Sequence, residues 1–243
     1  MKFAIIAAGE GARLAAEGIT QPKPLIPLCG TTMIERLISI FHGCEAEEIV
    51  VIVNTLRPET EQTVRALSAA HPEYHLRIVV QTTPSTMHSF ASLAPYLGDA
   101  PFVLTTVDTI FRPTEFAAYV EAFRHGLEAG DDGLMAVTDY IDDESPLYVG
   151  VDAQHRVTGF YDKREEVPEA AATPLYISGG IYALSPNALH TLHRCMGEGQ
   201  SRMRNFQRGL IADGLHLRAY PFSQILDVDH AGDIAKAEAF LQA

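Results

Sequence analysis

The chain has few basic residues for its length. Lysine and arginine number 18 against 31 aspartates and glutamates, which gives 243 residues a formal net charge of −13. This acidic balance argues against a nonspecific nucleic-acid partner and against a membrane-surface partner, because both present negative charge. It does not exclude small anionic substrates, which need only a few cations that converge in one cleft. The basic residues beside glycines are therefore the first candidates for function.

Cysteine is also scarce, tryptophan is absent, and long apolar runs are missing. The three cysteines, Cys29, Cys44 and Cys195, are odd in number, widely spaced and form no C-x-x-C pair. This pattern argues against a disulfide framework or a zinc site and favours a reducing compartment. The first apolar run, in "MKFAIIAAGEG", breaks at glycine, and no later run reaches the length of a membrane span. We therefore expect a soluble cytoplasmic protein.

The first half of the chain alternates apolar runs with segments of helical spacing. Strands are expected at 2–8, 47–54, 75–81 and 100–108, and helices at 31–41, 58–70, 86–97 and 113–130. The second half has strands at 133–140, 147–153, 156–162 and 177–184, then helices near 186–195 and 201–213, a strand at 215–222 and a last helix. The alternation predicts an α/β fold with a mostly parallel, Rossmann-like sheet, helices on both faces and an antiparallel extension. No linker or repeat divides it, so one domain is expected over 1–243.

Three polar or glycine positions follow directly after predicted parallel strands. Gly9, Gln81 and Asp108 each lie just past the carboxyl end of a strand. Ligands of such sheets gather at the carboxyl ends of the strands. We therefore expect these three positions to share one edge of the sheet.

The glycine loop "AAGEGARL" (residues 7–14) matches neither of two common nucleotide motifs. A dinucleotide loop needs a third glycine where Leu14 stands and an acid about twenty residues later, yet 18–34 holds neither Asp nor Glu. No G-K-[ST] follows either, which excludes a Walker loop. The prolines of "EGITQPKPLIP" predict that no compact helix starts directly after the glycines. An ordinary glycine turn with a surface Arg13 remains an alternative.

Lys23 lies between two prolines, Pro22 and Pro24. Proline fixes its own φ and favours an extended residue before it, so Lys23 is predicted to be a fixed cation in an extended segment. Together with Arg13 and the backbone N–H groups of the glycine loop, it would form a cradle for several phosphates. We expect replacement of Lys23 to reduce turnover with little effect on stability.

The glycine loop with "PKPLIPLCGTTMIERLI" resembles the signature of the nucleotidyltransferases that make nucleotide-diphospho sugars. "VLTTVD", "LYVGVDAQHRVTGFYDK", "ISGGIYAL" and "DVDHAGDIAKAEAFL" are similar to later segments of that family, in the same order. The resemblance implies the GT-A-like fold of the nucleotide-diphospho-sugar transferases, with a nucleotide-binding half at about 1–110 and a substrate half at about 111–243. It also implies attack of a sugar 1-phosphate, or a similar phosphate monoester, on the α-phosphorus of an NTP, releasing pyrophosphate. No general base is needed, since the attacking oxygen is already ionised near neutral pH.

The residue roles follow from the resemblance together with local chemistry. Catalysis is assigned to Arg13, Lys23 and Asp108, and nucleotide binding to Ala7, Ala8, Gly9, Glu10, Gly11, Arg13, Lys23, Gln81 and Ser85, of which the last two would read base edges. Substrate binding is assigned to Gly150, Asp162, Lys163, Gly179 and Gly180, and Mg²⁺ binding to Asp108, Asp227 and Asp229. Period-two spacing places the carboxylates of "DVD" on one side of the chain.

Structural alternatives accompany several of these roles. Asp108 and Asp229 are residue types that also cap helices, Lys163 is an ordinary solvated charge in "DKREE", and Gly179 and Gly180 are compatible with a β-bulge. Three other functions stay open. A GT-A glycosyltransferase would usually show D-x-D where this chain has V-D-T, and a non-catalytic sugar-nucleotide sensor would have lost its cations. A phosphocholine-type cytidylyltransferase would favour an aromatic cage that a chain without tryptophan does not suggest. The base, the acceptor and the oligomeric state are not determined by the sequence.

Overall fold

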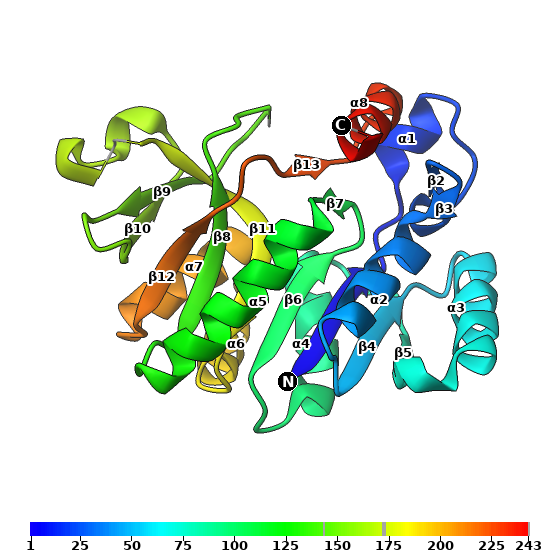
Figure 1. Cartoon of the computed structure of the whole chain (residues 1–243), viewed down its shortest axis with the longest axis horizontal. Coiled ribbons are helices and arrows are strands. Elements are labelled where there is room, and N and C mark those ends of the chain that lie inside the picture. Colours follow the sequence, from blue (N-terminus) through cyan, green and yellow to red (C-terminus); the bar gives the residue numbers. More distant parts are fainter. Residues whose placement is uncertain (143, 172–173, 243) are drawn as a thin grey trace.

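The structure is a computed structural model that describes residues 1–142, 144–171 and 174–242. Its described residues form a nine-stranded sheet with helices on both faces (Figure 1). The strands are β1 (Lys2–Ala7), β4 (Glu48–Val53), β5 (Leu76–Val80), β6 (Phe102–Thr106), β8 (Gly133–Thr138), β9 (Tyr148–Val151), β10 (Val157–Tyr161), β11 (Tyr176–Leu184) and β12 (Leu217–Pro221). Two short ladders pair β2 (Pro27–Leu28) with β3 (Thr31–Thr32) and β7 (Thr109–Ile110) with β13 (Leu226–Asp227).

The strand order is β10-β9-β11-β6-β1-β4-β5, with β8 beside β11 and β12 beside β8. The strands β6, β1, β4 and β5 are mutually parallel, whereas β11 joins β6 in the antiparallel sense and carries β8 and β9 the same way. The prediction of a mostly parallel α/β sheet with an antiparallel extension is confirmed. The register sets Ala7 opposite Val53 and Ile6 opposite Thr106, so the carboxyl ends of the three central strands lie level.

The helices are α1 (Ala12–Ala16), α2 (Met33–Gly43), α3 (Pro58–Ala70), α4 (Thr86–Leu97), α5 (Pro113–Glu128), α6 (Ala188–Gly197), α7 (Met203–Ala212) and α8 (Ala231–Gln242). Successive side chains of a strand point to opposite faces. In β1, Phe3 and Ile5 therefore pack in the core beneath α2 and α5, while Ala4 and Ile6 pack in a second core beneath α4, α6 and α7. No helix in the described residues is long and apolar enough to cross a membrane.

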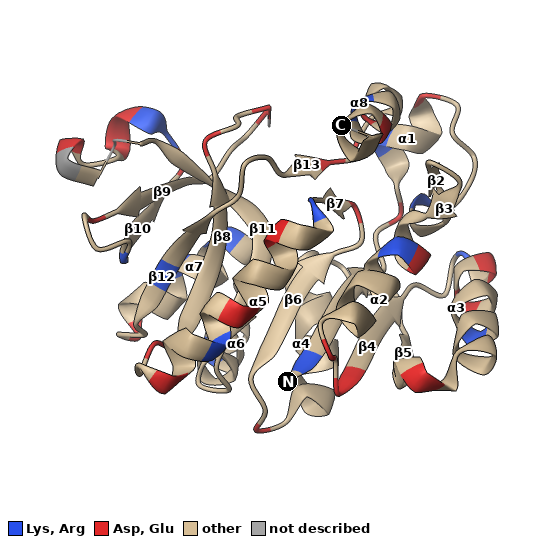
Figure 2. Cartoon of the chain, in the orientation of Figure 1, with Lys and Arg blue, Asp and Glu red and all other residues tan. Residues whose placement is uncertain are grey.

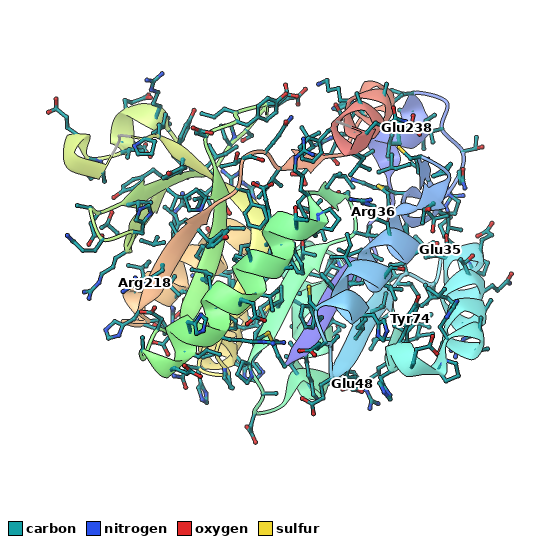
Figure 3. All side chains as sticks on the ribbon, in the orientation of Figure 1. Glu35, Arg36, Glu48, Tyr74, Arg218 and Glu238 are labelled. Atoms are coloured by element: carbon teal, nitrogen blue, oxygen red, sulfur yellow. The ribbon has the colours of Figure 1, made fainter. Side chains whose placement is uncertain are left out.

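The start of α2 shows why a predicted helix forms where it does. The Thr32 side chain accepts the Glu35 N–H, and the Glu35 carboxylate accepts the Thr32 N–H, which together make a capping box (Glu35 is labelled in Figure 3). The apolar stripe beyond it, which includes Ile34, Leu37 and Phe41, is buried. Helix α2 packs against the turn at Lys23–Leu25 and is followed by β4 of the sheet.

Two local expectations are wrong. A short helix, α1, does start directly after Gly11, because the ten residues from 12 to 21 that separate Gly11 from the first proline, Pro22, leave room for its five residues. Lys23 does not lie in an extended segment: it begins a 3-10 turn (Lys23–Leu25) in which the Leu25 N–H donates to the Pro22 carbonyl at 2.8 Å. The extended residue is Pro22 itself, with ψ 133°.

The acidic excess is spread over the fold. Figure 2 shows acidic segments on most helices and at many strand ends, with basic segments fewer and scattered. Against this scattered background, the two cations Arg13 and Lys23 lie together at the carboxyl ends of β1 and β6.

Candidate active site

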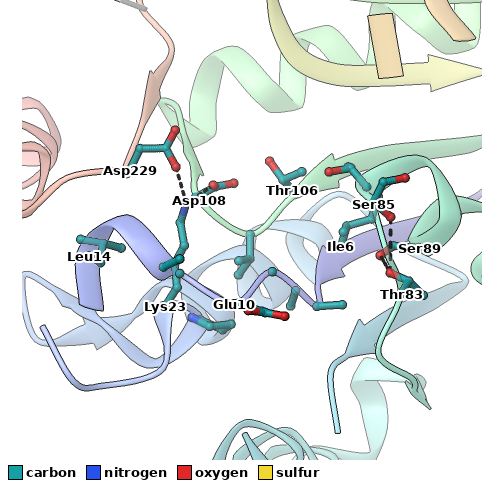
Figure 4. Close-up of a pocket in the computed structure, with 18 of the residues that line it drawn as sticks. Ile6, Glu10, Leu14, Lys23, Thr83, Ser85, Ser89, Thr106, Asp108 and Asp229 are labelled. Atoms are coloured by element: carbon teal, nitrogen blue, oxygen red, sulfur yellow. Dashed lines mark hydrogen bonds and ion pairs between the residues drawn. The ribbon is translucent and has the colours of Figure 1, made fainter. Parts of the chain in front are cut away.

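A cleft of about 420 Å³ opens at the carboxyl ends of β1 and β6 (Figure 4). Its lining includes Ala7, Ala8, Gly9, Glu10, Gly11, Arg13, Lys23, Thr83, Ser85, Ser89, Asp108 and Asp229. The sequence placed most of these residues in one site, and the structure brings them together. Gly11 takes a left-handed conformation (φ +66°), and a Cβ there would lie 3.2 Å from Cβ of Lys23, so this close turn suits glycine.

Lys23 lies between two carboxylates in this cleft. Its Nζ contacts Oδ2 of Asp108 and lies 2.7 Å from Oδ1 of Asp229, with only 10 % of the lysine side chain exposed. Arg13 Nη1 lies 2.8 Å from the other oxygen of Asp229. Both cations that the sequence assigned to phosphates therefore pair with carboxylates in this structure.

The short β7–β13 ladder positions the carboxylates. Asp227 is opposite Thr109, and the Val228 N–H donates to the Asp108 carbonyl at 3.1 Å. Glu17, at the end of α1, accepts the Ala231 N–H at 2.6 Å and contacts Nδ1 of His230 at 2.5 Å. The C-terminal segment is thus tied both to the β6 end and to the glycine loop.

The electrostatics reflect this crowding. Burial opposes the charge on Lys23, yet Asp108 and Asp229 raise its pKa. Burial likewise opposes the charge on Asp229, but Lys23 and Arg13 lower the pKa of that carboxyl. Burial of the Asp227 carboxyl, with Asp108 and Asp229 nearby, raises its pKa to about 8. Asp227 as a whole residue is exposed; the negative charges of Asp108 and Asp229 act in the same upward direction as burial, and Lys23 opposes them.

The carboxylate oxygens of the cleft are donors of the kind that divalent cations bind. Oδ1 of Asp108 is buried and has no hydrogen-bond partner among the described residues, and Asp227 and Asp229 add oxygen donors nearby. Among residues 1–142, 144–171 and 174–242, however, no three histidine, cysteine, aspartate or glutamate side chains form a ready metal site. Mg²⁺ is commonly held by one or two carboxylates together with substrate phosphates. The residues therefore fit a cation that arrives with a phosphate.

The two predicted base readers differ in placement. Gln81 is exposed and does not line the cleft, and its backbone N–H continues the ladder to the Val53 carbonyl at 2.9 Å. Ser85 lines the cleft, but its hydroxyl caps α4 through the His88 N–H and contacts His88 Nδ1 at 2.8 Å. Base reading by either residue stays a prediction.

Two further cavities adjoin Asp227 on the side of β11. One, of about 300 Å³, is lined by Gly179, and the other, of about 630 Å³, by Gly180. A Cβ on Gly179 would fall 2.2 Å from Cδ1 of Ile225, so this position admits little more than glycine without movement of Ile225.

The other predicted substrate residues do not line these cavities. Gly150 is buried, and a Cβ there would lie 2.8 Å from Oγ1 of Thr158, which gives this glycine a packing role. Asp162 is held by Arg204 at 2.5 Å and by Arg208 at 2.7 Å. Lys163 is exposed and lines neither cavity. Substrate contact by these residues stays a prediction.

Sequence reasoning missed several residues around the cleft. Arg202 lines the larger cavity, and Asn54 contacts the glycine loop. Glu17 and His230 join the loop to the C-terminal segment. Only Asn54 carried a signal, since it follows a buried strand, as Gly9 and Asp108 do; the others become visible only through contacts between distant segments.

The model of the family described as "MobA-like NTP transferase domain" matches residues 3–207. Curated relatives include the CMP-5'-(3-aminopropyl)phosphonate synthase of Streptomyces rubellomurinus, 29 % identical over 59 % of this chain and 25 % of its own length. The bifunctional protein GlmU of Synechococcus sp. (strain CC9605) is 24 % identical over 100 % of this chain and 52 % of its own length. The mannose-1-phosphate guanyltransferase of Hypocrea jecorina is 26 % identical over 78 % and 50 %. The chain thus spans about half or less of these relatives.

Solved structures share the fold over nearly the full chain. A UDP-glucose pyrophosphorylase in complex with UDP-glucose aligns with a TM-score of 0.76 at 16 % identity, covering 98 % of this chain and 97 % of that one. The inositol-1-phosphate CTP transferase from T. maritima aligns with a TM-score of 0.73 at 14 % identity, covering 99 % and 97 %. The resemblance to sugar-phosphate nucleotidyltransferases is confirmed at the level of family and fold. The chain belongs to the family of MobA-like NTP transferase domains.

Proposed function

We propose that this chain transfers a nucleotidyl group from an NTP to a sugar 1-phosphate or a similar small phosphate, with release of pyrophosphate. The observation that carries the proposal is the arrangement of Lys23 and Arg13 against Asp108 and Asp229 beside the glycine loop. Curated relatives whose names describe a mannose-1-phosphate guanyltransferase and a phosphonate synthase support the same reaction class. The organic acceptor is therefore a phosphate monoester or a phosphonate.

In the proposed reaction an ionised acceptor oxygen forms a bond to the α-phosphorus, and the bond from that phosphorus to the pyrophosphate oxygen breaks. Lys23 neutralises charge at the α-phosphate and Arg13 binds the departing pyrophosphate, so positioning and electrostatics supply the catalysis. Both side chains exchange Asp229 for phosphate oxygens when the nucleotide binds. Asp108, with Asp227 and Asp229, would hold Mg²⁺, which when bound offsets the repulsion between carboxylates and triphosphate.

Arg202 is our proposed anchor for the acceptor phosphate. It is exposed in the cavity that contains Asp227, and its side chain makes no ion pair or hydrogen bond with any other described residue. Its neighbour Arg204 is already held by Asp162. A guanidinium that is free to pair with a phosphate is available here, whereas Lys163 lies outside the cavity.

Pyrophosphate release tests the function directly. The purified chain is assayed with ATP, CTP, GTP and UTP against a panel of sugar 1-phosphates, phosphocholine and an aminoalkylphosphonate, with and without Mg²⁺. Release that requires both an NTP and an acceptor supports the proposal. Transfer of a sugar from a nucleotide sugar to an acceptor contradicts it. The absence of pyrophosphate release with every combination of NTP and acceptor contradicts it as well.

The acceptor anchor is tested by comparing Arg202→Ala with Lys163→Ala. We expect Arg202→Ala to raise the acceptor KM about tenfold or more, as the loss of a charge-assisted contact does, with the NTP KM little changed. If Lys163→Ala raises the acceptor KM more than Arg202→Ala does, Lys163 binds the acceptor phosphate, as the family resemblance indicates, and the role proposed for Arg202 is refuted.

A further inference from the structure

Asn54 is a buried polar side chain directly after β4, and only 3 % of it is exposed. Its Nδ2 donates to the Ala8 carbonyl at 3.2 Å and to the Gly9 carbonyl at 3.3 Å. Its Oδ1 accepts the N–H groups of Leu56 at 3.1 Å and Arg57 at 3.0 Å. Both ends of the amide are satisfied, and the two carbonyls on one side and two N–H groups on the other fix its orientation.

These contacts set the direction of the glycine-loop backbone. In a trans peptide the carbonyl and the following N–H point in opposite directions. With the Ala8 and Gly9 carbonyls turned to Asn54, the N–H groups of Gly9 and Glu10 point away from it. In the part of the chain that the structure describes, neither N–H donates to another group. Both residues line the cleft.

We propose that Asn54 is a positioning residue for nucleotide binding: by holding the Ala8 and Gly9 carbonyls, it presents two unpaired backbone donors to the nucleotide. Consecutive free N–H groups are a common way to bind anions and acceptor atoms. The inference rests on the proposed function, since it concerns the same cleft. It adds a residue whose role is to orient the loop, without contact to the nucleotide.

Asn54→Asp separates the two halves of this side chain. The carboxylate keeps an acceptor for Leu56 and Arg57 but places an oxygen against the Ala8 and Gly9 carbonyls, which repel it. Asn54→Ala removes both halves without introducing charge and serves if the aspartate variant does not fold. Thr82→Val is the control: the Thr82 hydroxyl accepts the Thr55 N–H at 3.1 Å and so joins the segment after β4 to the segment after β5. Among the described residues, it makes no hydrogen bond to the glycine loop.

The test is calorimetric titration of each protein with ATP, CTP, GTP and UTP, alongside thermal melting and the acceptor KM. We expect Asn54→Asp to raise the nucleotide Kd about tenfold or more and Asn54→Ala about fivefold, from the loss of two hydrogen bonds that fix the loop. Thr82→Val should stay within about twofold. The acceptor KM should be unchanged, because the acceptor side of the cleft does not contact Asn54.

The outcomes separate this inference from the proposed function. If the wild-type chain binds a nucleotide and the folded Asn54 variants bind it equally well, the positioning role is refuted while the function stands. A lower melting temperature with an unaltered Kd identifies a purely structural residue and refutes the role too. If the wild-type chain binds none of the four nucleotides, the proposed function is refuted, and the role of Asn54 is refuted too because it depends on that function.

Discussion

Replacing Lys23 by methionine tests the charge arrangement of the cleft. The variant keeps a side chain of similar length but loses the ammonium group that contacts Asp108 and Asp229. Arg13 still contacts Asp229, so the unpaired group is chiefly Asp108. From the sequence we expect the loss of Lys23 to leave stability nearly unchanged; its burial between two carboxylates instead leads us to predict a loss of stability.

The magnitude follows from burial. The side chains of Lys23 and Asp108 are 10 % and 18 % exposed, and removing one partner of a buried ion pair costs about 3–5 kcal/mol. Asp229 is 41 % exposed and loses less, so the lower figure, about 3 kcal/mol, applies. For a chain of this length, that loss lowers Tm by about 6–12 °C.

Thermal melting in EDTA and in millimolar Mg²⁺ measures the effect. We expect Lys23→Met to melt well below wild type in EDTA and to recover more on addition of Mg²⁺, because a divalent cation replaces the missing charge. Lys236→Met is the control: this lysine also pairs with two carboxylates, Asp142 and Asp233, but is 52 % exposed, so its loss should shift Tm by a degree or two at most. Turnover of Lys23→Met should fall about a hundredfold or more.

Two results would refute this reasoning. Equal melting temperatures of wild type and Lys23→Met in EDTA would mean that the lysine pairs with water in solution. Equal responses of both proteins to Mg²⁺ would mean that the cation binds elsewhere.

Three further outcomes are expected. Gly150→Ala should lower Tm, since overpacking against Thr158 costs about 1–3 kcal/mol. The activity per folded molecule should stay normal. A raised acceptor KM would instead indicate that Gly150 contacts the substrate. Because the pKa of Asp227 is raised to about 8, the folded chain retains a proton that the unfolded chain has released, so the free energy of unfolding should fall as pH rises from about 4 to about 8. Urea titrations should show this slope in wild type and less of it in Asp227→Asn. Asp108→Asn should abolish Mg²⁺-dependent pyrophosphate release, and full activity in that variant would place the phosphates elsewhere.

Local signals accounted for the elements that could be predicted. The helix expected at 86–97 matches α4, because Ser85 supplies the cap and an apolar face that includes Phe90 and Leu97 continues behind it. The strands that lead to Gly9 and Asp108 were visible as apolar runs, and because β1 and β6 are parallel neighbours their carboxyl ends lie together.

Contacts between distant segments could not be predicted in this way. The pairing of Lys23 with Asp229 joins residues 206 positions apart, and Arg204 reaches Asp162 across 42 positions. Neither leaves a periodic pattern. Lys163 is the opposite case, because its motif was recognisable in the sequence. Whether it lines a cavity depends on how the β9–β10 hairpin packs against the rest of the fold, which the motif does not determine.

The bond from the Val228 amide to the Asp108 carbonyl has a consequence for the motions of this chain. The ladder holds only two residue pairs, but Val228 beside it is fully buried, so the segment from Leu226 onward opens only when Val228 leaves the core. Such an opening carries Asp227 and Asp229 away from Lys23 and exposes the Val228 amide to solvent. The rate at which that amide exchanges its hydrogen for deuterium therefore reports how often the cleft comes apart in an otherwise native molecule.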